Sequence, residues 1–198
     1  MEKTIVVATN NAHKAMEIRD ILPDYKVLTL ADFDFAGDIV EDGETFLDNA
    51  IIKATEGAKI TKTMTLADDS GLEVDALNGA PGVHSKRFAD TDEERIDKLL
   101  KLLDGAENRA ARFKCTVAIV DADLKVVATF VGTVEGSIGF IPEGENGFGY
   151  DPIFIPDGHS HSLATLTAAE KNAISHRGEA FQQVSDYFSF SILGRDHS

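Results

Sequence analysis

The chain has 198 residues, of which 43% are hydrophobic and 27% charged, so it is long enough for one domain with a sizeable core. Its formal net charge of −15 argues against nucleic acid or an anionic membrane surface as a partner, because their phosphates would repel it. Charged residues interrupt every apolar run before the roughly 20 residues that a membrane helix needs, and no leader-like segment opens the chain. We therefore expect a soluble protein of the cytoplasm, with its one cysteine, Cys115, as a buried strand residue.

The first predicted unit is a strand, a polar turn and a helix. A β-branched run at residues 4–8 predicts the strand, and the helical pattern that follows the turn ends at Pro23. The turn consists of Thr9, Asn10, Asn11, Ala12, His13 and Lys14. This order presents backbone N–H groups and a positive helix end to an anion. The turn lacks the glycines of a Walker motif, so an Asn-rich helix cap explains it equally well.

A second strand is predicted at residues 26–30 and a helix at about residues 46–59, with Thr45 as the N-cap. The acidic segment 38–44 precedes this helix. A solvated loop that complements the helix dipole is one interpretation of its acids, and a metal ligand among Glu41 to Glu44 is the other. Lys53 lies among small residues of the helix, from where its long side chain can reach a nearby site.

The segment 67–71 (ADDSG) follows a short apolar strand that we expect to end at its two carboxylates. Neighbouring side chains on extended backbone point to opposite faces, so only one of Asp68 and Asp69 is expected to face a cleft. An aspartate at a strand end is a hard-oxygen ligand suited to Mg²⁺. For Asp68, hydrogen bonds that shape the turn are favoured over metal binding.

The second half of the chain adds a helix and a hairpin. The apolar stripe at about residues 93–103 predicts an amphipathic helix packed on the core, and Gly105 ends it. Two alternating segments, 112–121 and 125–138, predict an antiparallel pair of strands. Together with the parallel strands expected earlier, they predict a mixed sheet in an α/β domain without a linker.

A glycine-rich loop at residues 142–150 is followed by a short helix that carries Lys171 and by a last helix that begins near residue 175. Phe148 and Tyr150 of the loop, with the turn at residues 175–177, offer stacking surface and donors for a base. Tyr150 is equally well explained as a core residue. With Asp69, an acid from segment 41–44 and the lysines, these segments predict a metal-assisted phosphoryl site.

The chain also resembles a known family, the noncanonical purine nucleoside triphosphate pyrophosphatases, which act on inosine and xanthosine triphosphates. The matching blocks, in order, are residues 8–14, 41–54 (EDGETFLDNAIIKA), 66–83 (LADDSGLEVDALNGAPGV), 147–154 (GFGYDPIF) and 170–178 (EKNAISHRG). The resemblance implies Mg²⁺-dependent hydrolysis of ITP, dITP and XTP to the monophosphate and pyrophosphate. It also implies a single domain over residues 1–198, with an elongated mixed sheet flanked by helices. Two lobes would enclose the active-site cleft, and the protein would be a homodimer.

Carried over by position, the resemblance assigns Mg²⁺ to Glu41 and Asp69, with Asp69 also accepting the proton of the attacking water. It places the triphosphate on the turn 9–14 beside Lys53, with Ser70 against the substrate. It assigns the base pocket to Phe148, Gly149, Tyr150, Asp151, Lys171, His176 and Arg177. One departure is Lys86, which stands where the family has alanine and which we expect in solvent instead of at a phosphate.

Two other functions compete with this prediction. A nucleotide-binding module without catalysis is less favoured, because it has no use for the acidic pair. A pyrophosphatase for pyrimidine or modified nucleotides, as in the Maf-type proteins of similar fold, is less favoured because of the blocks at residues 148–151 and 175–177.

Overall fold

The computed structural model describes residues 3–193, which contain one six-stranded mixed sheet in the order β2-β1-β3-β4-β5-β6. The strands are β1 (Lys3–Val7), β2 (Tyr25–Thr29), β3 (Thr65–Val74), β4 (Ala110–Val120), β5 (Val126–Ile138) and β6 (Phe154–Pro156). β1 runs parallel to β2 and β3, whereas β3 to β6 pair antiparallel in succession. The predicted mixed sheet and the hairpin of β4 and β5 are therefore confirmed.

Helices flank this sheet. The α-helices are α1 (Ala12–Ile21), α2 (Phe46–Thr61), α3 (Asp92–Leu102), α4 (Ala168–Ile174) and α5 (His176–Leu193). The 3-10 helices are η1 (Leu30–Phe33), η2 (Asp75–Leu77), η3 (Gly82–Arg87), η4 (Asp151–Ile153) and η5 (Leu163–Thr165). Capping boxes begin α2, α3 and α4, at Thr45, Thr91 and Thr167. Among residues 3–193, no helix has both the length and the apolar character that crossing a membrane requires.

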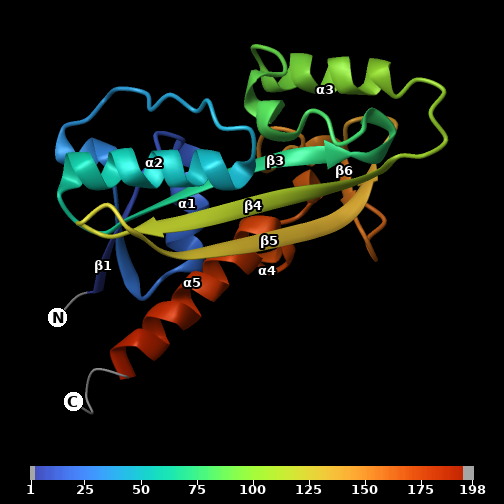
Figure 1. Cartoon of the computed structure of the whole chain (residues 1–198). Helices are drawn as coiled ribbons and strands as arrows, with labels where there is room; N and C mark the ends of the chain where they lie inside the picture. The colour runs from blue at the N-terminus through green and yellow to red at the C-terminus, as the bar shows by residue number, and fades with distance from the viewer. Residues whose placement is uncertain (1–2, 194–198) are drawn as a thin grey trace.

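The core consists of three groups of buried apolar side chains. One group lies between the sheet and the pair α1 and α5, and includes Ile18 and Phe181. A second lies on the other face of the sheet, where Ala54 of α2 packs with Ala118 of β4. The third joins Leu99 of α3 to Leu72 and Val74 at the C-terminal end of β3, over which α3 lies (Figure 1). The sheet thus has α2 on one face and α1 with α5 on the other, and α3 lies at its far end.

The central strand differs from the prediction. β3 is one strand of ten residues that pairs with β4 along its whole length, from Thr65 opposite Val120 to Val74 opposite Ala111. The expectation that a strand ends at the two carboxylates is therefore wrong. The pairing with β4 continues through Ser70, which lies opposite Cys115, so the polar segment stays extended. Asp68 and Asp69 lie in mid-strand and project to opposite faces, as the alternation predicted.

Candidate active site

A cleft of about 530 Å³ lies over the middle of β3. Its walls come from the turn after β1, from α2, η3 and the first turn of α3, and from the segment before η4 with α4 and α5. The predicted site residues in these walls are Thr9, Asn10, Asn11, His13, Lys14, Glu41, Lys53, Asp69, Ser70, Phe148, Gly149, Tyr150, Asp151, Lys171, His176 and Arg177. Ala12, the first residue of α1, is the one member of the predicted set that is not among the described wall residues. The fold brings these segments together, while the role of each residue remains a prediction.

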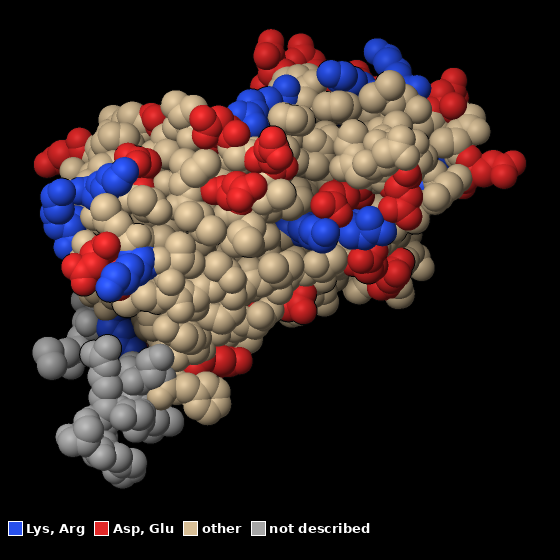
Figure 2. Space-filling view, in the orientation of Figure 1, with Lys and Arg blue, Asp and Glu red and all other residues tan. Residues whose placement is uncertain are grey.

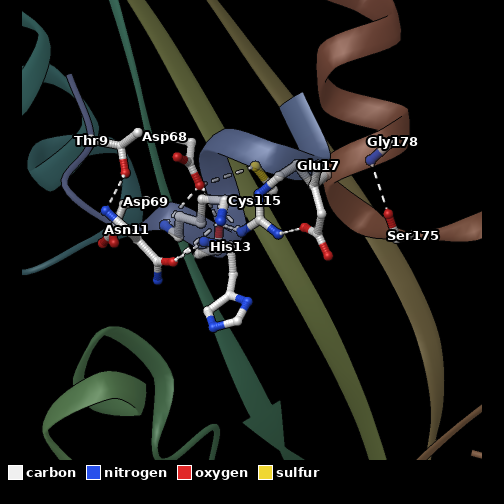
Figure 3. A network of polar contacts seen from close by, with 12 residues as sticks. Thr9, Asn11, His13, Glu17, Asp68, Asp69, Cys115, Ser175 and Gly178 are labelled. Atoms are coloured by element: carbon white, nitrogen blue, oxygen red, sulfur yellow. Dashed lines mark hydrogen bonds and ion pairs between the residues drawn. The ribbon is translucent and has the colours of Figure 1, made fainter. Parts of the chain in front are cut away.

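The polar turn after β1 begins one wall of the cleft. The side chain of Asn11 accepts hydrogen bonds from the backbone N–H groups of His13 at 3.0 Å and Lys14 at 3.2 Å, and so caps α1. Thr9 Oγ1 accepts the backbone N–H of Asn11 at 3.1 Å (Figure 3). The helix-cap interpretation is therefore confirmed, and the capped N-terminus of α1 lines the cleft, whereas anion binding there stays a prediction.

Asp69 lies in the wall formed with α2. The side-chain amide of Asn49 donates to Asp69 Oδ2 at 3.0 Å, and Lys53 Nζ lies 3.4 Å from Asp69 Oδ1. The same ammonium donates to Glu41 Oε2 at 2.9 Å, so one cation bridges both predicted metal ligands. Asn49 also accepts the backbone N–H of Gly43 at 2.9 Å, which holds the acidic segment against α2.

Their surroundings shift the pKa values of both Asp69 and Lys53. Burial raises the pKa of Asp69 above its ordinary value, and Lys53 and Lys14 only partly oppose this effect. Burial alone would lower the pKa of Lys53, but the carboxylates of Asp69 and Asp68 outweigh it and raise that pKa. Lys53 therefore stays charged, whereas Asp69 takes up a proton more readily than an exposed aspartate does. A carboxylate of this kind is suited to proton transfer.

Glu41 and Asp69 present carboxylate oxygens to one point of the cleft, the point that Lys53 bridges. Within residues 3–193, no group of three or more His, Cys, Asp or Glu side chains is arranged to hold a metal ion. Mg²⁺ does not require such a cage, because it commonly takes one or two carboxylates and completes its shell with water and substrate phosphates. The two acids therefore fit a Mg²⁺ ion that binds together with a nucleotide.

Asp68 lies on the opposite face of β3, where its side chain is buried among cations (Figure 3). Its Oδ2 lies 2.8 Å from Lys14 Nζ and 3.4 Å from Arg177 Nη2. Ser70 Oγ donates to the same oxygen at 2.7 Å. Burial alone would raise the pKa of Asp68, but Lys14 and Arg177 outweigh it and hold that pKa far below its usual range. These contacts favour the structural role of Asp68 over a role as metal ligand.

Glu17 of α1 is a residue that the sequence analysis missed. Its carboxylate pairs with Lys171 Nζ at 2.7 Å and with Arg177 Nη1 at 2.5 Å, and Lys171 also pairs with Asp151 Oδ2 at 2.5 Å. Burial alone would raise the pKa of Glu17, but Arg177 and Lys171 outweigh it and lower that pKa. The available clue was its spacing of three residues from Lys14, which places both side chains on one helix face.

Aromatic rings line the same end of the cleft. Phe148 and His13 stack with ring centroids 5.3 Å apart and planes inclined by 20°. Lys171 Nζ lies 4.7 Å from the centroid of Phe148. His176 stacks on Phe113 at 4.8 Å and is buried. Burial, followed by the neighbouring cations, lowers the pKa of His176 well below its usual value, so the ring is neutral, with one donor and one acceptor nitrogen.

Tyr150 is a buried residue that also borders the cleft. Its side chain is buried, and its hydroxyl donates to the backbone oxygen of Ser85 in η3 at 3.0 Å. It also belongs to the wall of the cleft. Tyr150 therefore ties the segment before η4 to η3 while it contributes surface to the site.

Four charged residues of the η3 and α3 wall were not assigned to the site from sequence. Lys86 was expected in solvent, and it is exposed, yet it also lines the cleft. Its neighbour Arg87 donates to the backbone oxygen of Glu41 at 2.9 Å. Asp92 and Arg95 of α3 complete this wall. No local motif marks these residues, because their place in the site depends on how η3 packs against β3.

Comparison with known proteins finds relatives over nearly the whole chain. Residues 5–187 match the model of the Ham1 family. A dITP/XTP pyrophosphatase of Coxiella burnetii is 44% identical over 196 residues, which cover 96% of this chain and 98% of the relative. A dITP/XTP pyrophosphatase of Bacillus subtilis is 45% identical over 190 residues, which cover 92% and 96%.

Solved structures agree with this similarity. A HAM1 protein from Coxiella burnetii superposes with a TM-score of 0.86 at 44% identity, covering 94% of this chain and 98% of the other. The Ham1 protein of Staphylococcus aureus gives a TM-score of 0.85 at 40% identity, covering 96% and 100%. The likeness therefore extends over nearly the whole chain.

Proposed function

The chain belongs to the Ham1 family, and we propose that it hydrolyses dITP, ITP and XTP to the nucleoside monophosphate and pyrophosphate. It is a nucleoside triphosphate pyrophosphatase, because relatives of about 44% identity over nearly their full length carry that activity in their names. One observation carries the assignment of substrate to site. A single cleft has a carboxylate–lysine cluster at one end and an aromatic–cation cluster at the other. A nucleoside triphosphate has a phosphate chain that suits the first end and a planar base that suits the second.

The triphosphate is placed at the end formed by the turn after β1 and by α2. The capped N-terminus of α1 and the ammonium groups of Lys14 and Lys53 attract phosphate oxygens. Glu41 and Asp69 would hold Mg²⁺ there, with Lys53 releasing them to pair with a phosphate. The ion would lower the pKa of a bound water and offset charge on the phosphates. Ser70, which lies beside Asp69 in the wall, would contact the substrate.

The chemical step is hydrolysis at the α-phosphorus. Asp69 accepts a proton from the attacking water, and the water oxygen forms a new bond to the α-phosphorus. The bond from that phosphorus to the α,β-bridging oxygen breaks, and pyrophosphate leaves with the electron pair. The position of Asp69 in the cleft, beside Lys53 and Glu41, supports this role, because a base must lie within reach of the water that it deprotonates.

The base is placed at the end formed by Phe148, Lys171, His176 and Arg177. Hypoxanthine and xanthine carry an oxygen at position 6, where adenine carries an amino group. Cationic donors such as Lys171 and Arg177 suit that oxygen, whereas an adenine amino group would leave a donor facing a donor. Discrimination by polar mismatch of this kind can reach about 10⁴.

A panel of nucleoside triphosphates with Mg²⁺ tests the proposal. We expect pyrophosphate from dITP, ITP and XTP, and little product from ATP, CTP or UTP. Hydrolysis in ¹⁸O-labelled water should place the label in the monophosphate, because attack occurs at the α-phosphorus. Label in the pyrophosphate, or release of orthophosphate, would refute this mechanism.

We also propose that residues 1–198 form one domain of two lobes, and that the protein is a homodimer of the cytoplasm. The family resemblance of the sequence supports these points. Light scattering on the eluted protein should give twice the mass of one chain, and thermal unfolding should show a single transition. A mass of one chain, or two separate transitions, would contradict them.

A further inference from the structure

The segment 147–151 carries the aromatic residues Phe148 and Tyr150 of the base end. Two hydrogen bonds that are at least partly buried hold this segment. Asp151 Oδ2 accepts the backbone N–H of Phe148 at 2.8 Å, and the hydroxyl of Tyr150 reaches Ser85 in η3. Between them, Gly149 adopts a left-handed backbone with φ of +64°, which turns its N–H toward α3. Neither of these two hydrogen bonds involves Gly149, whose N–H is directed to α3.

Asp92 supplies that contact from a distant part of the chain. Its Oδ2 accepts the backbone N–H of Gly149 at 2.7 Å. Its Oδ1 is paired with Arg95 Nη1. Arg95 is fixed in turn, because its Nε and Nη2 donate to the backbone oxygens of Ala89 at 3.0 Å and Asp90 at 3.1 Å. The carboxylate of Asp92 is thus oriented within α3 and the turn before it, independently of the segment it holds.

We propose that Asp92 is a positioning residue for the base end of the cleft. By holding the Gly149 amide, it keeps Phe148 and Tyr150 turned toward the bound base, and it does not touch the reacting phosphates. This inference rests on the proposed function, since it assigns the base to that end. Asp92, Arg95 and Gly149 all line the cleft, so a loss of this bond alters the wall that the substrate meets.

A plainer role must be separated from this one. Asp92 is the first residue of α3, and an acid in a first turn stabilises a helix through the dipole. Glu93 shares that location and is exposed, but no described contact joins it to segment 147–151. Glu93→Ala is therefore the matched control for Asp92→Ala.

The test compares steady-state hydrolysis of dITP by the full-length wild type, Asp92→Ala, Asp92→Asn and Glu93→Ala. For Asp92→Ala we expect the KM for dITP to rise about tenfold, as for the loss of one charge-assisted hydrogen bond, with kcat within about twofold. Asparagine keeps an acceptor oxygen, so Asp92→Asn should recover most of the lost affinity. Glu93→Ala should match the wild type in both constants.

Inhibition by inorganic tripolyphosphate gives the second readout, because this probe has phosphates but no base. Its inhibition constant should be the same for the wild type and Asp92→Ala. The proposal is overturned if the KM of Asp92→Ala is unchanged, if tripolyphosphate binding weakens as much as dITP binding, or if Asp92→Asn or Glu93→Ala is as impaired as Asp92→Ala. A wild type that releases no pyrophosphate from any purine triphosphate would instead refute the proposed function itself.

Discussion

At the scale of single residues, the main feature is that two adjacent aspartates have opposite properties. Asp68 and Asp69 are both buried, and burial alone would raise both pKa values. Lys14 and Arg177 outweigh the effect of burial at Asp68, whereas Lys53 and Lys14 oppose it only partly at Asp69. One aspartate is therefore a fixed charge, and its neighbour is able to exchange a proton.

Asp69→Asn is expected to abolish turnover without loss of the fold. A general base contributes about 10²–10⁴ in rate, so kcat for dITP should fall at least about a hundredfold. The raised pKa means that ionised Asp69 does not stabilise the folded state, and neutral asparagine should leave the melting temperature within about 4 °C. The exposed Asp97→Asn serves as control for both measurements. A near wild-type rate in Asp69→Asn would remove this residue from the catalytic step.

Asp68→Asn is expected to act on stability instead. It leaves half-buried Lys14 without its anion and buried Arg177 with Glu17 alone, which costs about 3 kcal/mol of unfolding free energy. The folded-state pKa of Asp68 lies below the unfolded value of about 3.9, so the wild type holds this stability in full above that pH and loses it as the pH falls. Urea denaturation should therefore show a constant difference between the two proteins at pH 5 to 8 that narrows below about pH 4. A difference independent of pH would contradict the role of the charge.

At the scale of elements, the sequence correctly predicts those helices and strands that a local pattern of residues determines. The strands with β-branched residues, the helix that Thr45 caps and the hairpin of β4 and β5 are confirmed. β3 was predicted too short, because aspartate, serine and glycine disfavour strands, and pairing with β4 overrides that preference. Glu17 and Asp92 were missed for a related reason. Their partners are far along the chain, and no local pattern marks such contacts.

The contact between β5 and α5 gives a prediction for these elements. A Cβ at Gly132 would collide with the backbone oxygen of His176 and lie 2.6 Å from the backbone nitrogen of Ala180. Gly132→Ala must therefore displace the first turn of α5, which brings Arg177 to the cleft. We expect a loss of about 1–3 kcal/mol in unfolding free energy, measured in urea, and a raised KM for dITP.

Gly139→Ala is the matched control for this substitution. Its nearest neighbour would lie 3.4 Å from the new Cβ, an ordinary contact distance. It should retain both wild-type stability and the wild-type KM. Equal behaviour of the two alanine variants would show that the close approach at Gly132 does not control the position of α5.

At the scale of the molecule, an acidic protein presents cations to an anionic substrate. The net charge is −15, and acidic side chains are spread over the visible surface among fewer basic ones (Figure 2). The cleft nevertheless collects lysines and arginines from α1, α2, η3, α3, α4 and α5, which include Lys14, Lys53, Lys86 and Arg177. The electrostatic field at the cleft, and not the net charge of the protein, governs how a charged substrate approaches it. Composition argues against a large polyanionic partner but gives no location for these cations.

Removal of the metal gives a prediction at this scale. Chelation by EDTA should stop dITP hydrolysis, and added Mg²⁺ should restore it. The fold should survive, because Lys53 pairs with both Glu41 and Asp69 and offsets their charge. The melting temperature should therefore change by less than about 3 °C. Full activity in EDTA would exclude the proposed metal, and unfolding in EDTA would reveal a structural ion elsewhere.

The unbroken pairing of β3 with β4 has a consequence for selectivity. The floor of the cleft is a ten-residue strand in the middle of a sheet, so it has little freedom to adapt to one purine or another. The rim of the cleft, which consists of loops and helix ends, must therefore provide any adaptation to different purines. Nucleotides that the enzyme accepts should then share one turnover number and differ in how tightly they are bound, and kcat and KM values for dITP, ITP and XTP would reveal this. A common kcat would indicate that β3 keeps the same position with every substrate. Divergent kcat values would show that β3 changes position with the bound nucleotide.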